Sequence, residues 1–232
     1  MSEFLLVHGS CHGAWCWDDL TPHLQAAGHT ARAIDLPGHG QDQTPPQDVT
    51  LDLYARAIVD AITDPVVLVG HSMAGYPITA AANLAPEKIS KLIYLCAYVP
   101  MAGKSLADMR RMAPSQPLLE AVVVDDDRVT FHVDPSKAVD KFYHDVAPDR
   151  AAWAVSNLCP QPILPQETAM TPAHDLPRHY IRCSDDRTIP PAFQVTMTEN
   201  WTAGSVTTLP TSHSPFLSDP RGLAAELIAA AQ

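Results

Sequence analysis

A serine placed between glycines follows a short apolar stretch in the first third of the chain. The stretch Val66-Val67-Leu68-Val69 is apolar and mostly β-branched, which predicts a strand buried on both faces. It continues as Gly70-His71-Ser72-Met73-Ala74-Gly75, and the small residues that come next predict a helix. Ser72 is therefore expected on a sharp turn between strand and helix, with its hydroxyl above the sheet and the helix N-terminus behind it. The usual pattern of such a turn is Gly-x-Ser-x-Gly, whereas here Ala74 takes the fifth position and the glycine comes one place later.

A serine hydroxyl becomes a good nucleophile when a base removes its proton. His213, in the stretch Thr211-Ser212-His213-Ser214, can act as that base near neutral pH. A carboxylate must then hold the imidazole in the right tautomer. Asp185 and Asp186 compete for this role. We choose Asp186, because Asp-Arg-Thr-Ile-Pro suits an acid at the start of a loop that leads into a helix, and Asp185 is the alternative.

Backbone N–H groups can hold the negative charge that develops on oxygen when a nucleophile attacks a carbonyl. The glycine-containing loop at residues 8–13 directly follows a short apolar run at residues 4–7. We predict that the N–H of Ser10 in this loop, together with that of Met73 after the nucleophile, forms an oxyanion hole.

Metal ligation is the other chemistry that these residue types could serve. His8 and His12 lie four residues apart, but no third clustered ligand follows them, so we expect no metal. The three aspartates at residues 125–127 could bind a cation, although such a run is more typical of a solvated turn. We expect His71 to support the turn at Ser72 rather than to act as the base.

A scaffold must bring these groups together from distant parts of the chain. Apolar runs predict strands at residues 4–7, 29–35, 66–70, 89–99, 179–183 and 205–209, with a helix at 15–27 and further helices after residues 50, 72, 191 and 219. This alternation predicts an α/β fold, with a mostly parallel, twisted sheet and helices on both faces. In such a sheet, reactive groups gather beyond the carboxyl ends of the strands.

Residues 100–172 interrupt this alternation. They are rich in proline and contain an expected hairpin with an acidic turn, at residues 122–124 and 129–133, and expected short helices at 140–144 and 149–158. We predict that they form a cap inserted into a single domain of residues 1–232. Lying over Ser72, the cap could line a substrate pocket with apolar side chains, for which the candidates are Phe131, Phe142, Trp153 and Leu158.

Composition narrows the class of protein further. The net charge of −11 gives no electrostatic footprint for nucleic acid or an anionic membrane. The N-terminus has no basic segment followed by a long apolar run, and no stretch approaches the length of a membrane span. Five scattered cysteines are best explained as reduced thiols. We therefore expect a cytoplasmic protein, and a homodimer is compatible with the sequence.

Three stretches carry a resemblance to a known family: LVHGSCHGAWCW at residues 6–17, LVGHSMAG at 68–75 and DRTIPPAF at 186–193, with His213 near the end. They are similar to the α/β-hydrolase fold group that contains hydroxynitrile lyases, plant methyl-ketone and methyl-salicylate esterases and their bacterial relatives. The resemblance implies a cap over the site, no cofactor, and hydrolysis or cleavage of small neutral substrates.

Two positions separate the esterases from the lyases in this group. The lyases carry threonine where this chain has Gly9, and a lysine directly after the histidine where it has Ser214. The resemblance therefore favours a serine carboxylesterase that acts on a small ester. Two alternatives stay open: a non-catalytic small-molecule binding protein on the same fold, and lyase-like chemistry on the same residues.

Overall fold

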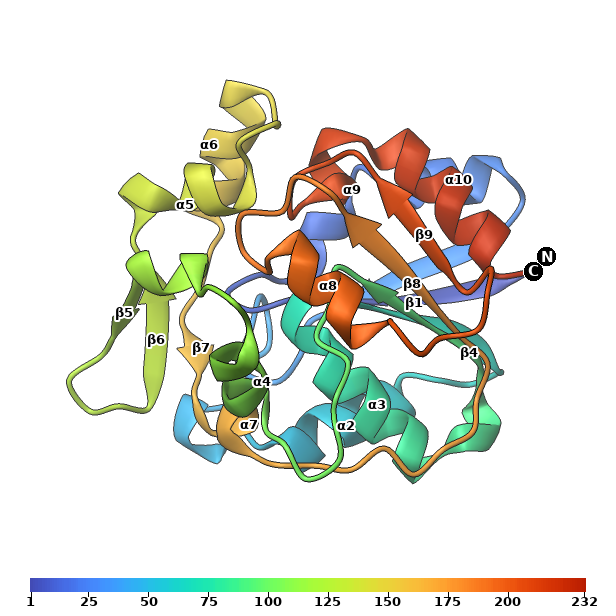
Figure 1. Cartoon of the computed structure of the whole chain (residues 1–232), viewed down its shortest axis with the longest axis horizontal. Helices are drawn as coiled ribbons and strands as arrows, with labels where there is room; N and C mark the ends of the chain where they lie inside the picture. Colours follow the sequence, from blue (N-terminus) through green and yellow to red (C-terminus); the bar gives the residue numbers. More distant parts are fainter.

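The computed structural model describes all 232 residues and contains a six-stranded parallel sheet (Figure 1). The strands lie in the order β2-β1-β3-β4-β8-β9. Their bounds are β1 Glu3–Val7, β2 Thr30–Ile34, β3 Val66–His71, β4 Ile89–Leu95, β8 Arg178–Cys183 and β9 Val206–Leu209. The strand order reverses between β1 and β3, and the crevice beyond the carboxyl ends of the strands at such a point is a common ligand site. The loop after β1 carries Ser10, and the turn after β3 carries Ser72.

Both faces of the sheet are covered by helices, as predicted. Successive side chains of a strand point to opposite faces, so Phe4 and Leu6 join one apolar core and Leu5 and Val7 join the other. The first core is shared with α1 (Thr21–Ala26), α9 (Pro215–Ser218) and α10 (Pro220–Ala230). The second is shared with α2 (Leu51–Asp60), α3 (Gly75–Leu84) and α8 (Pro191–Met197). The predicted α/β fold is confirmed.

Local sequence signals set several helix ends. Thr50 caps α2 by accepting a hydrogen bond from the N–H of Leu53 at 3.0 Å. The Asp219 side chain accepts one from the N–H of Gly222 at the start of α10, at 2.9 Å. None of the helices is both long and apolar enough to span a membrane.

The helix predicted at residues 15–27 is wrong as a continuous element. The chain forms a short 3-10 helix, η1 (Ala14–Trp17), and starts α1 only at Thr21. Pro22 lies in the first turn of α1, where its missing N–H is not needed, whereas a helix continuing from residue 15 would require that N–H. The strand predicted at 89–99 ends earlier, at Leu95, because Cys96 adopts a φ of +34° and turns the chain out of the sheet.

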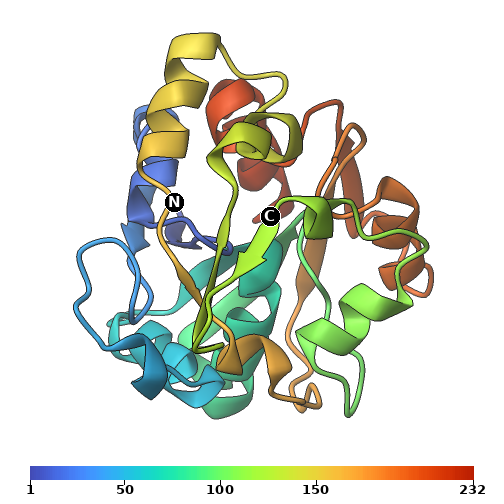
Figure 2. The same cartoon turned by 90° about the vertical axis from the view of Figure 1, so that its left-hand side faces the viewer.

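We call the segment between β4 and β8, residues 96–177, the cap. Its helices and strands lie on the side of the sheet away from the chain termini, and after Glu167 the chain returns past α2 and α3 to the start of β8 (Figures 1 and 2). A bridge between Lys104 and Met170 pairs the two ends of the cap. Its elements are α4 Leu106–Met112, η5 Pro117–Glu120, β5 Val122–Val124, β6 Thr130–Val133, α5 Pro135–Phe142, α6 Pro148–Ser156, β7 Gln161–Pro162 and α7 Leu164–Glu167.

The predicted hairpin is present in the cap as the antiparallel pair β5 and β6, and β7 adds a third strand that the sequence did not reveal. The helix predicted at 140–144 lies earlier, as α5. Its start is set by Asp134, which accepts a hydrogen bond from the N–H of Ser136 at 2.9 Å, and by Pro135 in the first turn. Apolar residues of the cap join the same core as α1, α9 and α10.

Candidate active site

Ser72 follows β3 directly and adopts the left-handed backbone conformation, with a φ of +56°. This conformation is uncommon for a residue with a side chain and often marks a functional turn. A Cβ atom at Gly75 would lie 1.9 Å from the carbonyl oxygen of Tyr98, and one at Gly9 would lie 2.8 Å from the Cβ of Ser72. A glycine is therefore required at position 75 and not at position 74. This explains why the glycine follows one place later than in the usual pattern.

The structure brings Ser72, His213 and Asp186 together. The Oγ of Ser72 lies 3.0 Å from Nε2 of His213, and Nδ1 of His213 lies 2.8 Å from Oδ2 of Asp186. All three residues are buried. A neutral imidazole that donates through Nδ1 to the carboxylate can accept the serine proton at Nε2.

Asp186 is held by three further hydrogen bonds. Its Oδ1 accepts from the N–H groups of Thr188 at 2.7 Å and Ile189 at 2.9 Å, and its Oδ2 accepts from Nε2 of Gln194 at 2.9 Å. Asp185, the alternative, is exposed. Its backbone oxygen accepts from Nε2 of His144 and its N–H donates to the carbonyl oxygen of Thr211, but its carboxylate forms no hydrogen bond. The geometry therefore distinguishes the two neighbouring aspartates: only Asp186 contacts the imidazole.

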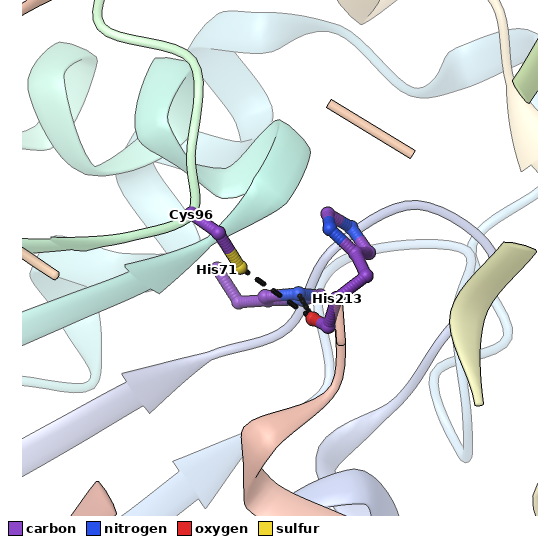
Figure 3. A group of neighbouring side chains, drawn as sticks. All are labelled: His71, Cys96 and His213. Carbon is purple, nitrogen blue, oxygen red and sulfur yellow. Dashed lines mark hydrogen bonds between the residues drawn. The ribbon is translucent and has the colours of Figure 1, made fainter. Parts of the chain in front are cut away.

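Two buried side chains hold the backbone of His213 rather than its ring. Nε2 of His71 donates to the carbonyl oxygen of His213 at 2.8 Å, and Sγ of Cys96 donates to the same oxygen at 3.5 Å. Figure 3 shows both side chains converging on that oxygen, and the imidazole of His213 lies beside the ring of His71, with ring centroids 4.6 Å apart. The ligand atoms of these three residues lie within 4.8 Å of one another, as in a metal site. Their hydrogen bonds instead indicate that His71 and Cys96 position the His213 loop.

Burial lowers the pKa of His71 well below its usual value, and the neighbouring His213 and His12 lower it further. The ring is therefore neutral at neutral pH and carries its hydrogen on Nε2, where it donates. Gly9 leaves room for the other nitrogen, because a Cβ at that position would lie 2.8 Å from Nδ1 of His71.

Ser10, Ser72 and Met73 line one small cavity of about 20 Å³ beneath the cap. The N–H of Ser10 donates to no other group of the protein. The two residues predicted to supply oxyanion donors therefore lie on the same cavity as the serine hydroxyl. A cavity of this size holds about one water molecule, so a substrate requires the cap side chains to move.

The cap contacts the loop that carries Ser10. Nε2 of Gln166, in α7, donates to the Oγ of Ser10 at 2.8 Å, and Oε1 of Gln161, in β7, accepts from the N–H of Cys11 at 3.3 Å. The loop after β1 is thus held from above as well as from within the sheet domain.

A comparison with known protein families identifies the family of this chain. Residues 4–226 match the model of the alpha/beta hydrolase family. The chain belongs to that family. The match spans the sheet and the cap alike, and it includes Ser72, Asp186 and His213.

The relatives of this hydrolase are esterases. Methylesterase 4 of Arabidopsis thaliana is 28% identical over 249 residues, which cover 97% of this chain and 95% of that protein. Esterase PIR7B of Oryza sativa subsp. japonica is 31% identical over 192 residues, covering 73% and 72%. The crystal structure of a pyrethroid hydrolase from Sphingobium faniae JZ-2 is similar with a TM-score of 0.88 at 27% identity, covering 99% of this chain and 97% of that one. The resemblance to the plant esterase group is confirmed, and the chain is an esterase-type hydrolase.

Of the four predicted pocket residues, two lie next to Ser72 or His213. Phe131, in β6, lines the cavity with Ser72. Phe142, at the end of α5, stacks on the imidazole of His213, with ring centroids 5.8 Å apart and an angle of 26° between the planes. Phe142 therefore packs behind the base and does not line the cavity.

The other two predicted pocket residues lie away from Ser72. Trp153, in α6, packs edge-on against Trp15 at 5.2 Å, and the guanidinium of Arg150 lies 3.6 Å from its ring. Leu158 lines a separate crevice of the cap, next to Cys159. Apolar character alone does not distinguish side chains that pack within the cap from those that line the site.

The two histidines at spacing four, His8 and His12, bind different partners. Nε2 of His8 accepts from the N–H of Leu36 at 3.1 Å. In His12, Nδ1 donates to the carbonyl oxygen of Ser10 at 2.7 Å and Nε2 accepts from the hydroxyl of Tyr143 at 2.7 Å. Burial lowers the pKa of His12 to about 4 and that of His8 well below its usual value, so both rings are neutral at neutral pH.

The acidic turn is held by its own aspartates. Asp125 accepts hydrogen bonds from the side chains of Thr130 and His132, and Asp127 accepts one from the N–H of Val129 at 2.9 Å. These side chains close the hairpin turn between β5 and β6.

Sequence reasoning missed several residues that line the cavity with Ser72, among them Tyr98, Arg110, Gln166 and Thr188. One signal was available. The pattern Ser105-x-x-Asp108 forms a capping box at the start of α4, and recognising it would have predicted the helix that carries Arg110. Nothing local in the sequence marks Gln166 as a neighbour of Ser10.

Proposed function

We propose that this hydrolase cleaves small carboxylic esters through an acyl-enzyme formed on Ser72. The observation that carries the proposal is the continuous hydrogen-bonded chain from Ser72 through His213 to Asp186, with distances of 3.0 and 2.8 Å. It supplies a nucleophile, a base and a carboxylate that orients the base. A buried site of this kind strengthens the electrostatic interactions on which such a reaction depends.

In the first half of the reaction, Oγ of Ser72 bonds to the ester carbonyl carbon while its proton passes to Nε2 of His213. The carbonyl oxygen becomes negatively charged, and the N–H groups of Ser10 and Met73 donate to it. Each donor of this kind contributes about 3 kcal/mol of transition-state stabilisation. The bond from carbon to the alcohol oxygen then breaks, and His213 protonates that oxygen, so the alcohol leaves and the acyl group stays on Ser72.

In the second half, water adds to the acyl carbon and gives a proton to His213. The bond to Oγ of Ser72 breaks, and His213 returns the proton to that oxygen. One ester and one water thus yield one acid and one alcohol, with no change of redox state and no further reactant. Asp186 steadies the imidazolium in both halves.

The direct test compares the wild type with Ser72→Ala in the turnover of p-nitrophenyl acetate. Loss of the nucleophile should lower kcat by about 10⁶-fold. Ser136→Ala, which removes an exposed serine on α5, is the matched control and should retain full activity. Equal turnover by the wild type and Ser72→Ala would refute the proposal.

The two alternatives receive less support. A Cβ at Gly9 would lie 2.8 Å from both Nδ1 of His71 and the Cβ of Ser72, so the threonine of the lyases does not fit here without rearrangement. Ser214, where the lyases carry lysine, is fully buried. Release of cyanide from cyanohydrins, measured beside ester turnover, distinguishes lyase chemistry. A mere binding protein would bind esters without releasing an acid.

Two further expectations complete the proposal. We expect the protein in the cytoplasm, which cell fractionation checks. A homodimer is compatible with the sequence, and sedimentation or light scattering measures the oligomeric state. The five cysteines are unpaired in the structure, and four of them are buried.

A further inference from the structure

The cavity at Ser72 holds a positively charged side chain that the proposed reaction does not use. Arg110, on the cap helix α4, lines this cavity together with Ser10, Ser72 and Met73. Hydrolysis through an acyl-enzyme needs donors at the carbonyl oxygen, which Ser10 and Met73 supply, but no fixed positive charge. A guanidinium in a small, partly closed site is costly unless something compensates it.

Arg110 has no carboxylate within ion-pair distance, whereas its neighbour Arg111 has one. Arg111 faces outward from the same helix and pairs with Asp108 at 2.7 Å. Arg110 is half-buried and lies close enough to Tyr98 to act on it: burial raises the pKa of the Tyr98 hydroxyl, and the charge of Arg110 opposes that rise. Tyr98 lines the same cavity, so the charge of Arg110 acts within the site.

A second cavity of about 140 Å³, lined entirely by residues of the cap, adjoins the first. Arg110, Phe131 and Gln166 line both, so they form the partition between them. The second cavity also holds Arg128 and one acid, Glu167. Neither arginine forms an ion pair with Glu167, so two positive charges face one negative charge there. Its remaining walls are apolar, namely Ala107, Leu119, Val122, Val124 and Ile163.

The shape, apolar lining and charge of the two cavities indicate what kind of ligand would fit them. An ester carbonyl at Ser72 would extend through a short apolar segment past Phe131 toward a region with excess positive charge. A guanidinium presents a planar fork of donors that matches a carboxylate, and it stays charged at all relevant pH values. Because the whole chain carries a net charge of −11, attraction of an anion must come from such a local site.

We propose that the substrates of this enzyme carry a carboxylate beyond the ester, as in short half-esters of dicarboxylic acids, and that Arg110 binds this carboxylate. This inference rests on the proposed function, because it assigns the substrate class of the same site. Arg110 is then the residue that determines specificity. Arg128, which lines the second cavity but not the first, adds to the local positive charge.

The experiment compares monomethyl with dimethyl esters of four- to six-carbon dicarboxylic acids. The wild type should have the higher kcat/KM on the monomethyl esters. In Arg110→Gln, kcat/KM should fall about 10- to 100-fold more on the monomethyl than on the dimethyl ester, the range expected for loss of a charge-assisted hydrogen bond. Most of this loss should appear in KM, because the carboxylate is bound equally in ground and transition states. Arg111→Gln, the matched control from the same helix, should retain the wild-type preference.

A second measurement does not depend on the variant folding. Dicarboxylates of the same lengths should inhibit wild-type hydrolysis of a neutral ester competitively, and the corresponding diols should not. Equal kcat/KM of the wild type on monomethyl and dimethyl esters, or equal losses on both in Arg110→Gln, would overturn the inference and leave the proposed function standing. If the wild type hydrolyses no ester and Ser72 resists a fluorophosphonate, the proposed function itself has failed.

Discussion

The sheet side and the cap side of this active site are built differently. On the sheet side, Ser72, Asp186 and His213 are 6%, 5% and 1% exposed, and each is bonded within the protein. On the cap side, Arg110 faces the cavity without a partner acid, and the edge strand β5 leaves Val123 and Val124 44% and 43% exposed. The groups proposed for bond-breaking are held rigidly, and those that would contact the rest of the substrate are not.

This difference teaches where change can be tolerated. A catalytic constellation works only when its members stay within a fraction of an ångström of the productive geometry, so it benefits from a buried, fully bonded setting. A segment that selects substrates can differ in a few side chains without disturbing that setting. We therefore expect substitutions on the sheet side to alter rates and those in the cap to alter preferences.

The two adjacent aspartates offer the strongest way to break this distinction. Asp186→Asn should lower kcat by about 10⁴-fold, because an amide favours the wrong tautomer of His213. Asp185→Asn should have little effect, because that side chain is exposed and does not contact the imidazole. Steady-state kinetics on one ester, with thermal unfolding as a check of folding, provides the measurement. A large loss in Asp185→Asn would contradict the assignment.

The buried histidines of the sheet side should make its stability depend on pH. The pKa of His12 is about 4 in the folded protein, against an ordinary value of 6.5. The unfolded chain therefore binds the proton first as the pH falls. The stability contribution is complete above pH 6.5 and is lost progressively toward pH 4, at about 1.4 kcal/mol per pH unit and about 3 kcal/mol in all for His12.

Urea unfolding at pH 7 and pH 5 measures this loss. The free energy of unfolding of His12→Gln should depend less on pH than that of the wild type, because the contribution of His12 is missing. His23→Gln, which removes an exposed histidine on α1, should show the wild-type dependence. A wild-type stability that does not change between these pH values would contradict the burial of neutral histidines.

A substitution at Gln166 tests whether the cap helps to position the loop that carries Ser10. The amide of Gln166 donates to the Oγ of Ser10 from α7 of the cap, at 2.8 Å. Gln166→Ala should lower kcat about 10-fold through a looser oxyanion loop, since small misplacements of a catalytic group are costly. Gln25→Ala, on the exposed face of α1, is the control. If kcat is unchanged in Gln166→Ala, the cap does not help to place Ser10.

The smallest effect on catalysis is expected at Trp153. Its ring packs against Trp15 and Arg150, beside the core that the cap shares with α1, α9 and α10, and it does not line the cavity at Ser72. Trp153→Ala should lower the thermal stability and leave the relative rates on a series of esters unchanged. Phe131→Ala, which opens the cavity, should change those relative rates. A change of preference in Trp153→Ala would place the substrate site elsewhere in the cap.

The same division explains what could be predicted from the sequence. The sheet side has local signals in the sequence. They are an apolar run and glycines around Ser72, a helix-capping residue at Thr50, and turn residues before the last helix. Such signals depend on neighbours along the chain, and they identified five of the six sheet strands to within two residues at each end, while β4 stops at Leu95, four residues before the predicted end. The loop that follows Asp185 and Asp186 likewise favours Asp186 as the carboxylate that contacts His213.

The cap side depends on contacts between residues far apart in the chain. Phe131 and Leu158 are both apolar residues of the same segment, yet only Phe131 reaches the cavity at Ser72. Arg110 lines this cavity from α4 of the cap, and Gln166 contacts Ser10, which lies 156 positions away in the sequence. No periodicity or composition encodes these pairings.

The most direct test of the central claim is the labelling of Ser72. A fluorophosphonate forms a covalent bond only with a serine whose proton a base can remove. The wild type should take up one phosphonyl group per chain, located by mass spectrometry in the peptide that contains Ser72, and His213→Ala should label far more slowly. A wild type that hydrolyses esters while Ser72 stays unlabelled, or that carries the label on another residue, would contradict the claim.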